Sequence, residues 1–105
     1  QTPPSDHDKN HLGGLVTIIV VRAINLPVPK EEAASCVKIT YGRTKLATGV
    51  VAYVPEYDGL AGYDPLNPDY NATFQIPLNY EHMQLDRTSC IKLELVNGKK
   101  VIGTL

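Results

Sequence analysis

The feature that most constrains the fold is the apolar run LVTIIVVRAI, residues 15–24. It is dense in β-branched residues and has no helical period, so it predicts a β-strand. Because its apolar residues follow one another without alternation, we expect both faces of this strand to be covered. Pro27 and Pro29 come directly after it, and proline cannot donate to a strand ladder. The run is also far shorter than the roughly 20 residues that cross a bilayer as a helix.

Further strands are predicted at short spacing along the rest of the chain. Their ranges are 36–41, 45–54 with a bulge at Gly49, 72–77, 90–96 and 101–105. Apolar and polar residues alternate in 36–41 and 90–96, as is typical of half-buried strands. Asn97-Gly98 predicts a tight hairpin. A single helical turn is all that we expect within 30–35 and 80–85. Six strands without a long helix predict an all-β, antiparallel β-sandwich.

The chain length is that of one domain. Of its 105 residues, 1–14 read as a polar Pro/Gly linker or tail, and 15–105 as the β-sandwich domain. A net charge of −1 gives no reason to expect nucleic-acid binding. Residues 1–14 have no signal-peptide pattern. Cys36 and Cys90 have no metal-ligand spacing, so we expect buried free thiols rather than a zinc site.

Four segments in order resemble the C2 domain, the calcium- and lipid-binding β-sandwich of signalling and trafficking proteins. They read LVTIIVVRAINLP, SCVKITYG, NPDYNATFQIPL and CIKLELVNGKKVIGTL. The resemblance implies a C2-like Greek key, with Tyr70 at a position where the family usually has tryptophan and Phe74 in the core. It also implies eight strands, so this chain is short of one or two edge strands. We expect the open edge to pair with a neighbouring segment, another chain or the tail.

The resemblance also shows which residues of this chain correspond to the family's calcium-binding loops. At these positions the sequence departs from the family pattern. Ala34 falls at a ligand aspartate, and the earlier aspartate falls near Lys30. The third loop is Asn97-Gly98-Lys99-Lys100, without the family's carboxylates. Calcium requires several carboxylate oxygens, so we expect a calcium-independent member with no metal site and no cofactor.

The middle loop, residues 55–68, is long for a compact domain, and such loops are often functional. Tyrosine supplies contact area at low entropic cost. One reading is a partner-contact loop, and the other is a solvated insertion. The contact candidates are Tyr57, Asp58, Tyr63 and Asp64.

Basic residues offer a second candidate surface. The resemblance places several on neighbouring strands, where relatives bind phosphoinositide headgroups, and two more at an apical loop. The candidates for lipid headgroups are Lys38, Arg43, Lys45, Lys92, Lys99 and Lys100. The competing reading is an ordinary solvated surface, because charge runs this short are routine.

No catalytic motif is present, and the histidines do not lie beside a nucleophile in sequence. We therefore expect a non-enzymatic protein-interaction or scaffold module of a larger cytoplasmic protein. The alternative is a peripheral membrane module that binds anionic phospholipid. A third possibility is a secreted or pore-forming sandwich, which a glycan on Asn71 or a Cys36–Cys90 disulfide would support. The disulfide is not expected, because the resemblance puts the two cysteines at opposite ends of the sheet.

Overall fold

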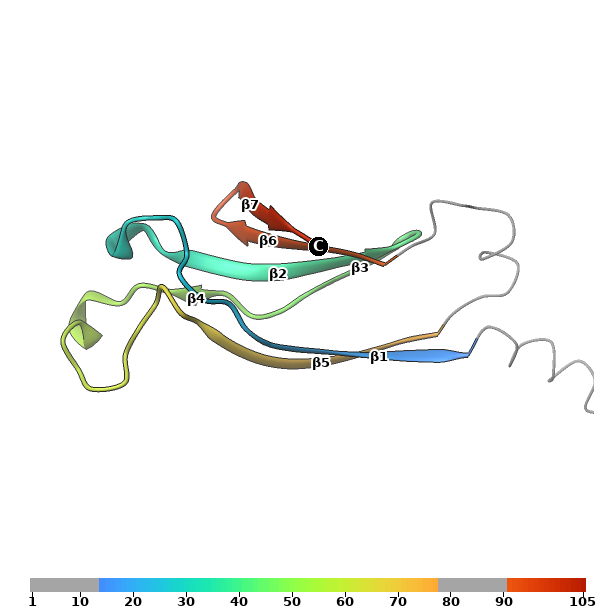
Figure 1. Ribbon diagram of the computed structural model, residues 1–105, viewed down its shortest axis with the longest axis horizontal. Helices are drawn as coiled ribbons and strands as arrows, with labels where there is room; N and C mark the ends of the chain where they lie inside the picture. Colours follow the sequence, from blue (N-terminus) through green and yellow to red (C-terminus); the bar gives the residue numbers. More distant parts are fainter. Residues whose placement is uncertain (1–13, 78–90) are drawn as a thin grey trace, which may run out of the picture.

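The computed structural model describes residues 14–77 and 91–105, which form two antiparallel sheets packed face to face (Figure 1). The smaller sheet pairs β1 (Leu15–Arg22) with β5 (Asp69–Pro77). The larger sheet has the order β3 (Thr44–Ala47), β2 (Ala34–Tyr41), β6 (Lys92–Asn97), β7 (Lys100–Thr104), and β4 (Val51–Ala52) also pairs with β2. The prediction of an all-β antiparallel sandwich is confirmed. The predictions for the tail, the turn within 80–85 and Cys90 concern residues outside the described ranges.

The core lies between the two sheets, and both contribute to it. Val20 and Ile76 project from the smaller sheet onto Val37, Ile39 and Tyr41 of β2. Ile39 and Ile76 are each 1% exposed. Burial of one such side chain stabilises the fold by roughly 1.5–3 kcal/mol.

Two aromatic side chains of β5 lie between the two sheets, and the sequence analysis predicted a core position for one of them, Phe74. Phe74 is half-buried and packs against the core cluster. Tyr70 reaches across the sandwich, and its Oη lies 2.7 Å from Oγ of the fully buried Ser35. The tyrosine hydroxyl therefore satisfies a buried polar group of the opposite sheet.

The prediction of one continuous strand over 45–54 is wrong. The structure divides it into β3 and β4, with Thr48, Gly49 and Val50 between them. Regular pairing ends at Thr48: its N–H still donates to the Val37 carbonyl at 2.9 Å, but the buried Val37 N–H donates to Thr48 Oγ1, also at 2.9 Å, in place of a backbone carbonyl. A side chain that takes over a strand's backbone donor competes with regular pairing.

The prediction that the first strand is covered on both faces is also wrong. Val16, Ile18 and Val20 face the core, whereas Ile19 on the outer face is 63% exposed. β1 is an outer strand of a two-stranded sheet, and no described element covers its outer face.

The tight turns occur where they were predicted. The hairpin predicted at Asn97-Gly98 forms, but its turn residues are Gly98-Lys99: Asn97 ends β6 opposite Lys100, and Gly98 adopts φ 63°. Residues 30–32 form the 3-10 turn η1 (Lys30–Glu32), and a second 3-10 turn, η2 (Pro55–Tyr57), lies in the middle loop. The two 3-10 turns, η1 and η2, lie at the same end of the sandwich, which we call the apical end (Figure 1).

Candidate functional site

At the apical end, a polar contact joins η1 to the middle loop. Lys30 Nζ lies 2.7 Å from Asp58 Oδ1, and Tyr53 Oη donates to Asp58 Oδ2 at 3.2 Å. The bond to Lys30 holds the pKa of Asp58 below its ordinary value of 3.8 and raises the pKa of Lys30 above 10.5. Partial desolvation, followed by the bond to Asp58, raises the pKa of Tyr53. Around neutral pH, Asp58 is therefore ionised, Lys30 is protonated and Tyr53 is neutral, as the contact requires.

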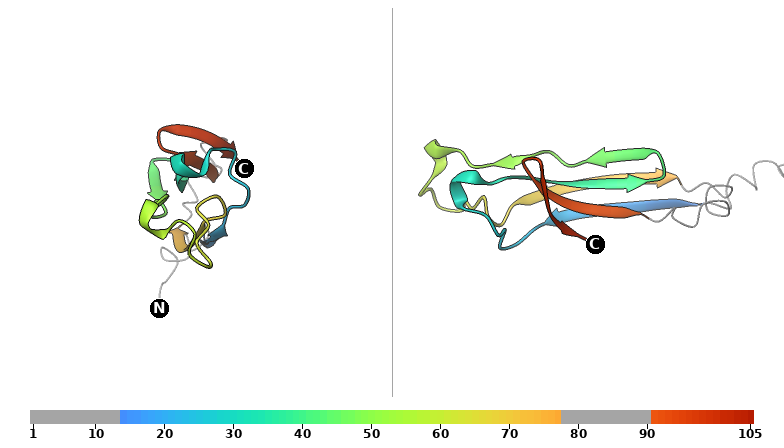
Figure 2. Two further views of the ribbon diagram at one scale, coloured as in Figure 1. Left: turned by 90° about the vertical axis from the view of Figure 1, so that its left-hand side faces the viewer. Right: turned by 90° about the horizontal axis from the view of Figure 1, so that it is seen from above.

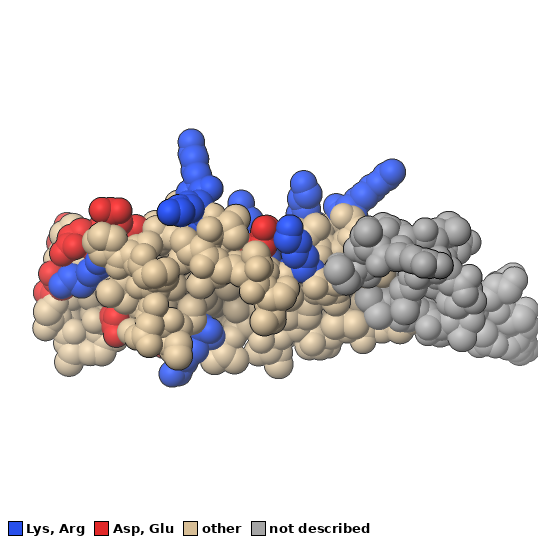
Figure 3. All heavy atoms as spheres, turned by 45° about the horizontal axis from the view of Figure 1, so that its top comes forward, with Lys and Arg blue, Asp and Glu red and all other residues tan. Residues whose placement is uncertain are grey.

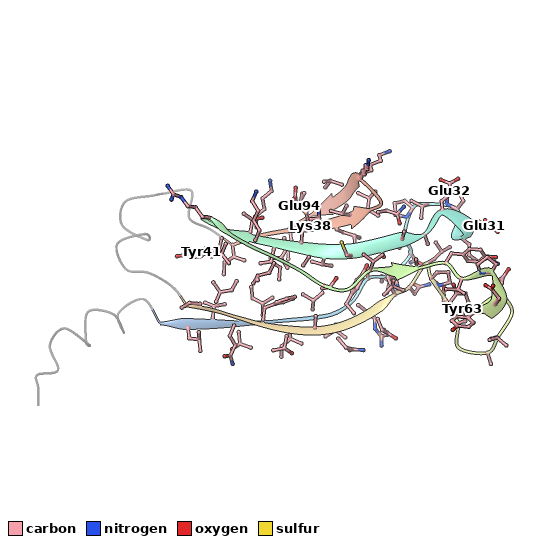
Figure 4. The ribbon with its side chains drawn as sticks, turned by 180° about the vertical axis from the view of Figure 1, so that it is seen from behind. Glu31, Glu32, Lys38, Tyr41, Tyr63 and Glu94 are labelled. Carbon is pink, nitrogen blue, oxygen red and sulfur yellow. The ribbon has the colours of Figure 1, made fainter. Side chains whose placement is uncertain are left out.

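Tyr63 fixes the middle loop through hydrogen bonds of its hydroxyl and contacts of its ring. Its Oη accepts the backbone N–H of Val54 and lies 3.5 Å from the carbonyl oxygen of Ala52. Its ring also contacts two neighbouring tyrosines. The centroid distances are 6.5 Å to Tyr53 and 5.7 Å to Tyr57, the latter in an edge-to-face arrangement. Figure 4 shows Tyr63 folded inside the loop, with Glu31 and Glu32 projecting outward from the opposite side of the apical end.

Asp64 and Asn67 fix the second half of the loop. Asp64 accepts hydrogen bonds from the Leu66 N–H at 3.1 Å and from Asn67 Nδ2 at 2.7 Å. Asn67 Oδ1 in turn accepts the N–H of Asn25 at 2.8 Å. The structure therefore places three of the four contact candidates, Asp58, Tyr63 and Asp64, in hydrogen bonds that hold the loop in place. Asp64 bonds within the loop, whereas Asp58 and Tyr63 bond to residues outside 55–68. Tyr57 is the fourth, and its side chain is 51% exposed.

Sequence reasoning missed the role of Asn97. Its Oδ1 accepts the Ala34 N–H at 2.8 Å, and its Nδ2 donates to the Glu32 carbonyl at 3.0 Å. The Gly98 N–H also donates to the Ala34 carbonyl, at 2.8 Å. Asn97 thus links the β6–β7 hairpin to the end of η1. The Asn-Gly pair signalled the turn, but nothing in the sequence signalled the partner of the side chain.

The basic candidates fall into two groups. Thr40 on the outer face of the larger sheet pairs with Lys45 on one side and Lys92 on the other, and Lys38 is two residues away on the same face. Arg43 lies in the adjoining β2–β3 turn, at the end of the sandwich away from the apical turns. Lys99 and Lys100 form the second group, at the β6–β7 hairpin.

The outer face is not uniformly basic. Glu94 lies directly across from Lys38 and makes a 3.5 Å ion pair with Lys92. Figure 4 shows Lys38 and Glu94 projecting on the same side, away from the smaller sheet. Figure 3 shows the basic side chains along this side and the acidic ones gathered mainly at the apical end.

The loops that the resemblance aligns with the calcium-binding loops of C2 domains carry other contacts in this chain. Ala34 and Asn97 are bonded to each other, and Lys30 is bonded to Asp58. Within 14–77 and 91–105 no cluster of three or more acidic, histidine or cysteine side chains is arranged to hold a metal ion. Across the same residues, no helix has the length and apolarity needed to cross a bilayer.

Comparison with known proteins adds a likeness of fold. No family model matches the chain, and no curated protein matches it by sequence. A solved structure of CC2D1B, described as coordinating ESCRT-III activity during the mitotic reformation of the nuclear envelope, superimposes with a TM-score of 0.56. The two are 20% identical over 87% of this chain and 39% of that chain. The likeness supports a C2-like fold. It extends to the fold alone, because the shared identity is low and the chain spans well under half of its neighbour.

Proposed function

We propose that this chain is a non-catalytic, calcium-independent interaction module of a larger cytoplasmic protein, and that its apical end contacts a protein partner. The proposal rests on the middle loop. Hydrogen bonds of Asp58 and Tyr63 hold this loop in place, whereas Tyr57 and Leu60 are exposed on it. A loop already held in one conformation loses little entropy when it binds.

The chemistry of this surface suits a protein rather than a small ligand. Tyr57 offers a large ring near the exposed Leu60 in the chain, and acidic side chains lie on both apical turns. Tyrosines within a polar rim are typical of protein contacts. The structural neighbour CC2D1B is described as coordinating ESCRT-III activity, which is compatible with a protein-interaction role for this chain.

Calcium independence is supported by the residues at the loop positions. Lys30 and Lys99 bring positive charge to the loops, and Ala34 has no oxygen ligand in its side chain. Glu31 and Glu32 could offer oxygens on the first loop, but the β6–β7 turn has lysines in place of the carboxylates that would complete a calcium site. Calorimetric titration with calcium chloride tests this point, and micromolar binding would contradict it.

A photo-crosslinking amino acid at position 57 tests the apical contact. We expect the full chain, expressed in cells with p-benzoylphenylalanine in place of Tyr57, to form a discrete protein adduct on irradiation. The same group in place of Gln75, exposed on the outer face of β5, is the matched control. Identical adducts from both positions, or none from position 57, would refute the apical contact.

A second candidate is binding to anionic lipid, favoured by the position of Lys38, Lys45 and Lys92 around Thr40 on one sheet face. Each basic residue near an anionic membrane contributes on the order of 1 kcal/mol. Vesicles of phosphatidylcholine with phosphatidylserine should then bind the chain at low salt and release it as salt rises. The triple change of these lysines to alanine should abolish binding. Absence of vesicle binding at low salt would eliminate this candidate.

A further inference from the structure

Asn97 and Gly98 join the β6–β7 hairpin to the end of η1 and the start of β2. Asn97 Oδ1 accepts the Ala34 N–H at 2.8 Å, and Asn97 Nδ2 donates to the Glu32 carbonyl at 3.0 Å. The Gly98 N–H donates to the Ala34 carbonyl at 2.8 Å. We call these three hydrogen bonds the hairpin contact. It depends on the side-chain amide of Asn97 and on the backbone N–H of Gly98.

The same two groups can react with each other. A backbone nitrogen can attack the side-chain carbonyl carbon of the asparagine that precedes it, which closes a succinimide ring and releases ammonia. Glycine permits this attack best, because it has no side chain to hinder the approach. In the whole sequence, Asn97 is the only asparagine followed by glycine. The sequence therefore makes Asn97 the most reactive asparagine of the chain.

The surroundings of the hairpin turn favour the reaction once the contact opens. Gly98, Lys99 and Lys100 are exposed, and Figure 2, viewed from the apical end, shows the β6–β7 turn at the outer margin of the sandwich. The end of a hairpin can open locally while the rest of the fold stays intact. The two lysines that follow Gly98 also favour the negative charge on its nitrogen after loss of the proton.

We propose that Asn97 is a deamidation site that reacts when the hairpin contact opens, and that the reaction releases η1 from the hairpin. The Gly98 nitrogen loses its proton to water and forms a bond to Cγ of Asn97, and Nδ2 leaves as ammonia. Water then opens the succinimide. Cleavage of the bond from the Gly98 nitrogen to Cγ gives aspartate, and cleavage of its bond to the backbone carbonyl carbon gives isoaspartate. Nothing is oxidised or reduced.

The closed contact keeps the two reacting groups apart. The Gly98 N–H is directed at the Ala34 carbonyl, and the Asn97 amide is held by Ala34 and Glu32. These hydrogen bonds must break before the nitrogen can approach Cγ. The rate of deamidation in the folded chain therefore measures how often the hairpin contact opens.

The product cannot restore the contact. In aspartate an oxygen replaces Nδ2, so two acceptors would face each other at the Glu32 carbonyl. Isoaspartate also adds a methylene carbon to the main chain of the hairpin, which displaces the Gly98 N–H from the Ala34 carbonyl. The reaction requires only water, so it is independent of the proposed contact between Tyr57 and a protein partner.

Asp58-Gly59 provides a control within the chain. An aspartate before glycine forms the same succinimide, but it reacts through its protonated carboxyl. The bond to Lys30 holds the pKa of Asp58 below 3.8, so this group is ionised in neutral and alkaline buffer. Asn97 should therefore react before Asp58, although both precede a glycine.

Incubation of the full 105-residue chain in mildly alkaline buffer tests the proposal. Peptide mapping by mass spectrometry, with chromatographic separation of the aspartate and isoaspartate forms, follows Asn97, Asn71 and Asp58 separately. A synthetic peptide of residues 91–101 is the unstructured reference. We expect Asn97 to react ahead of the other two sites in the chain, and at least about tenfold more slowly than in the peptide.

Two further measurements separate local opening from unfolding and test the release of η1. Ile76→Val removes a methylene from the core between the sheets and lowers global stability, so it should leave the rate at Asn97 unchanged. The deamidated chain, purified by ion exchange, should show faster hydrogen exchange at the Ala34 and Gly98 amides, by at least about tenfold, and a smaller change in β5. Asn97→Asp, which reproduces one product, should show the same pattern.

Four results would overturn the proposal. The first is no product at Asn97 in the folded chain after the peptide has converted, and the second is an equal rate in the chain and the peptide. The third is acceleration by Ile76→Val in proportion to the stability lost, which would place the reaction in the unfolded chain. The fourth is unchanged hydrogen exchange at Ala34 and Gly98 in the purified product, which would show that η1 is not released.

Discussion

At the scale of single residues, short polar side chains help to hold the apical end together. Asn67 and Asn97 each bond to a backbone group far away in sequence, Asn67 to Asn25 and Asn97 to Ala34. Such bonds cannot be derived from sequence, because an asparagine before Gly or Pro has the same local preference whether or not its side chain has a distant partner.

Asn97 should therefore contribute more to stability than an ordinary turn residue. Asn97→Ala leaves the part-buried Ala34 N–H without its acceptor and the Glu32 carbonyl without its donor. We expect the free energy of unfolding, measured by urea denaturation, to fall by about 1–3 kcal/mol. Asn97→Asp keeps the acceptor alone and should lose less. A loss no larger than that of Thr73→Ala, at an exposed position, would contradict this role.

The contact between Lys30 and Asp58 should have a defined pH range. The lowered pKa of Asp58 means that its contribution is complete above 3.8 and is lost as pH falls through the lowered value. The raised pKa of Lys30 means that its contribution is complete below 10.5 and is lost as pH rises further. We expect NMR shifts of the Gly59 and Leu60 amides to stay constant between these limits and to change beyond them. In Asp58→Asn the acid-side change should vanish, and its persistence would assign that change to another group.

At the scale of elements, Thr48 determines where one predicted strand becomes two. Its Oγ1 accepts the Val37 N–H and donates to the Gly49 carbonyl at 3.0 Å. Thr48→Val preserves shape but leaves a buried N–H unpaired, so we expect a loss of about 1–3 kcal/mol in the free energy of unfolding. Thr48→Ser keeps the hydroxyl and should stay within about 1 kcal/mol of the unaltered chain. Equal losses for both variants would show that the hydroxyl is not responsible.

The periodicity of the sequence was sufficient for most elements and failed at identifiable places. Alternation in residues 36–41 and 90–96 predicted half-buried strands, because a pleated strand sends successive side chains to opposite faces, and the structure has β2 and β6 there. It could not show that Ile19 faces solvent, since composition reports what a strand is suited to and not what lies beside it. For the site, sequence identified the tyrosine-bearing loop, but only the geometry separates the exposed Tyr57 from the internally bonded Tyr63.

At the scale of the whole molecule, an apolar core joins the two layers, and a polar contact crosses it. Tyr70 of β5 and Ser35 of β2 share a hydrogen bond of 2.7 Å, and Ser35 is fully buried. Burial raises the pKa of Tyr70, while the bond to Ser35 opposes that rise. The neutral phenol is thus the form that the sandwich favours.

A double-mutant cycle should measure this coupling between the layers. Tyr70→Phe and Ser35→Ala each leave a buried hydroxyl without its partner, so we expect each to lower the free energy of unfolding by about 1–2 kcal/mol. The double variant should lose less than the sum, by about 0.5 kcal/mol or more, because it removes both unsatisfied groups together. Because the pKa of Tyr70 is raised, its contribution should persist through pH 10.0 and decline above it, and Tyr70→Phe should remove that decline. Additive losses at neutral pH would mean that the hydroxyl pair does not couple the sheets.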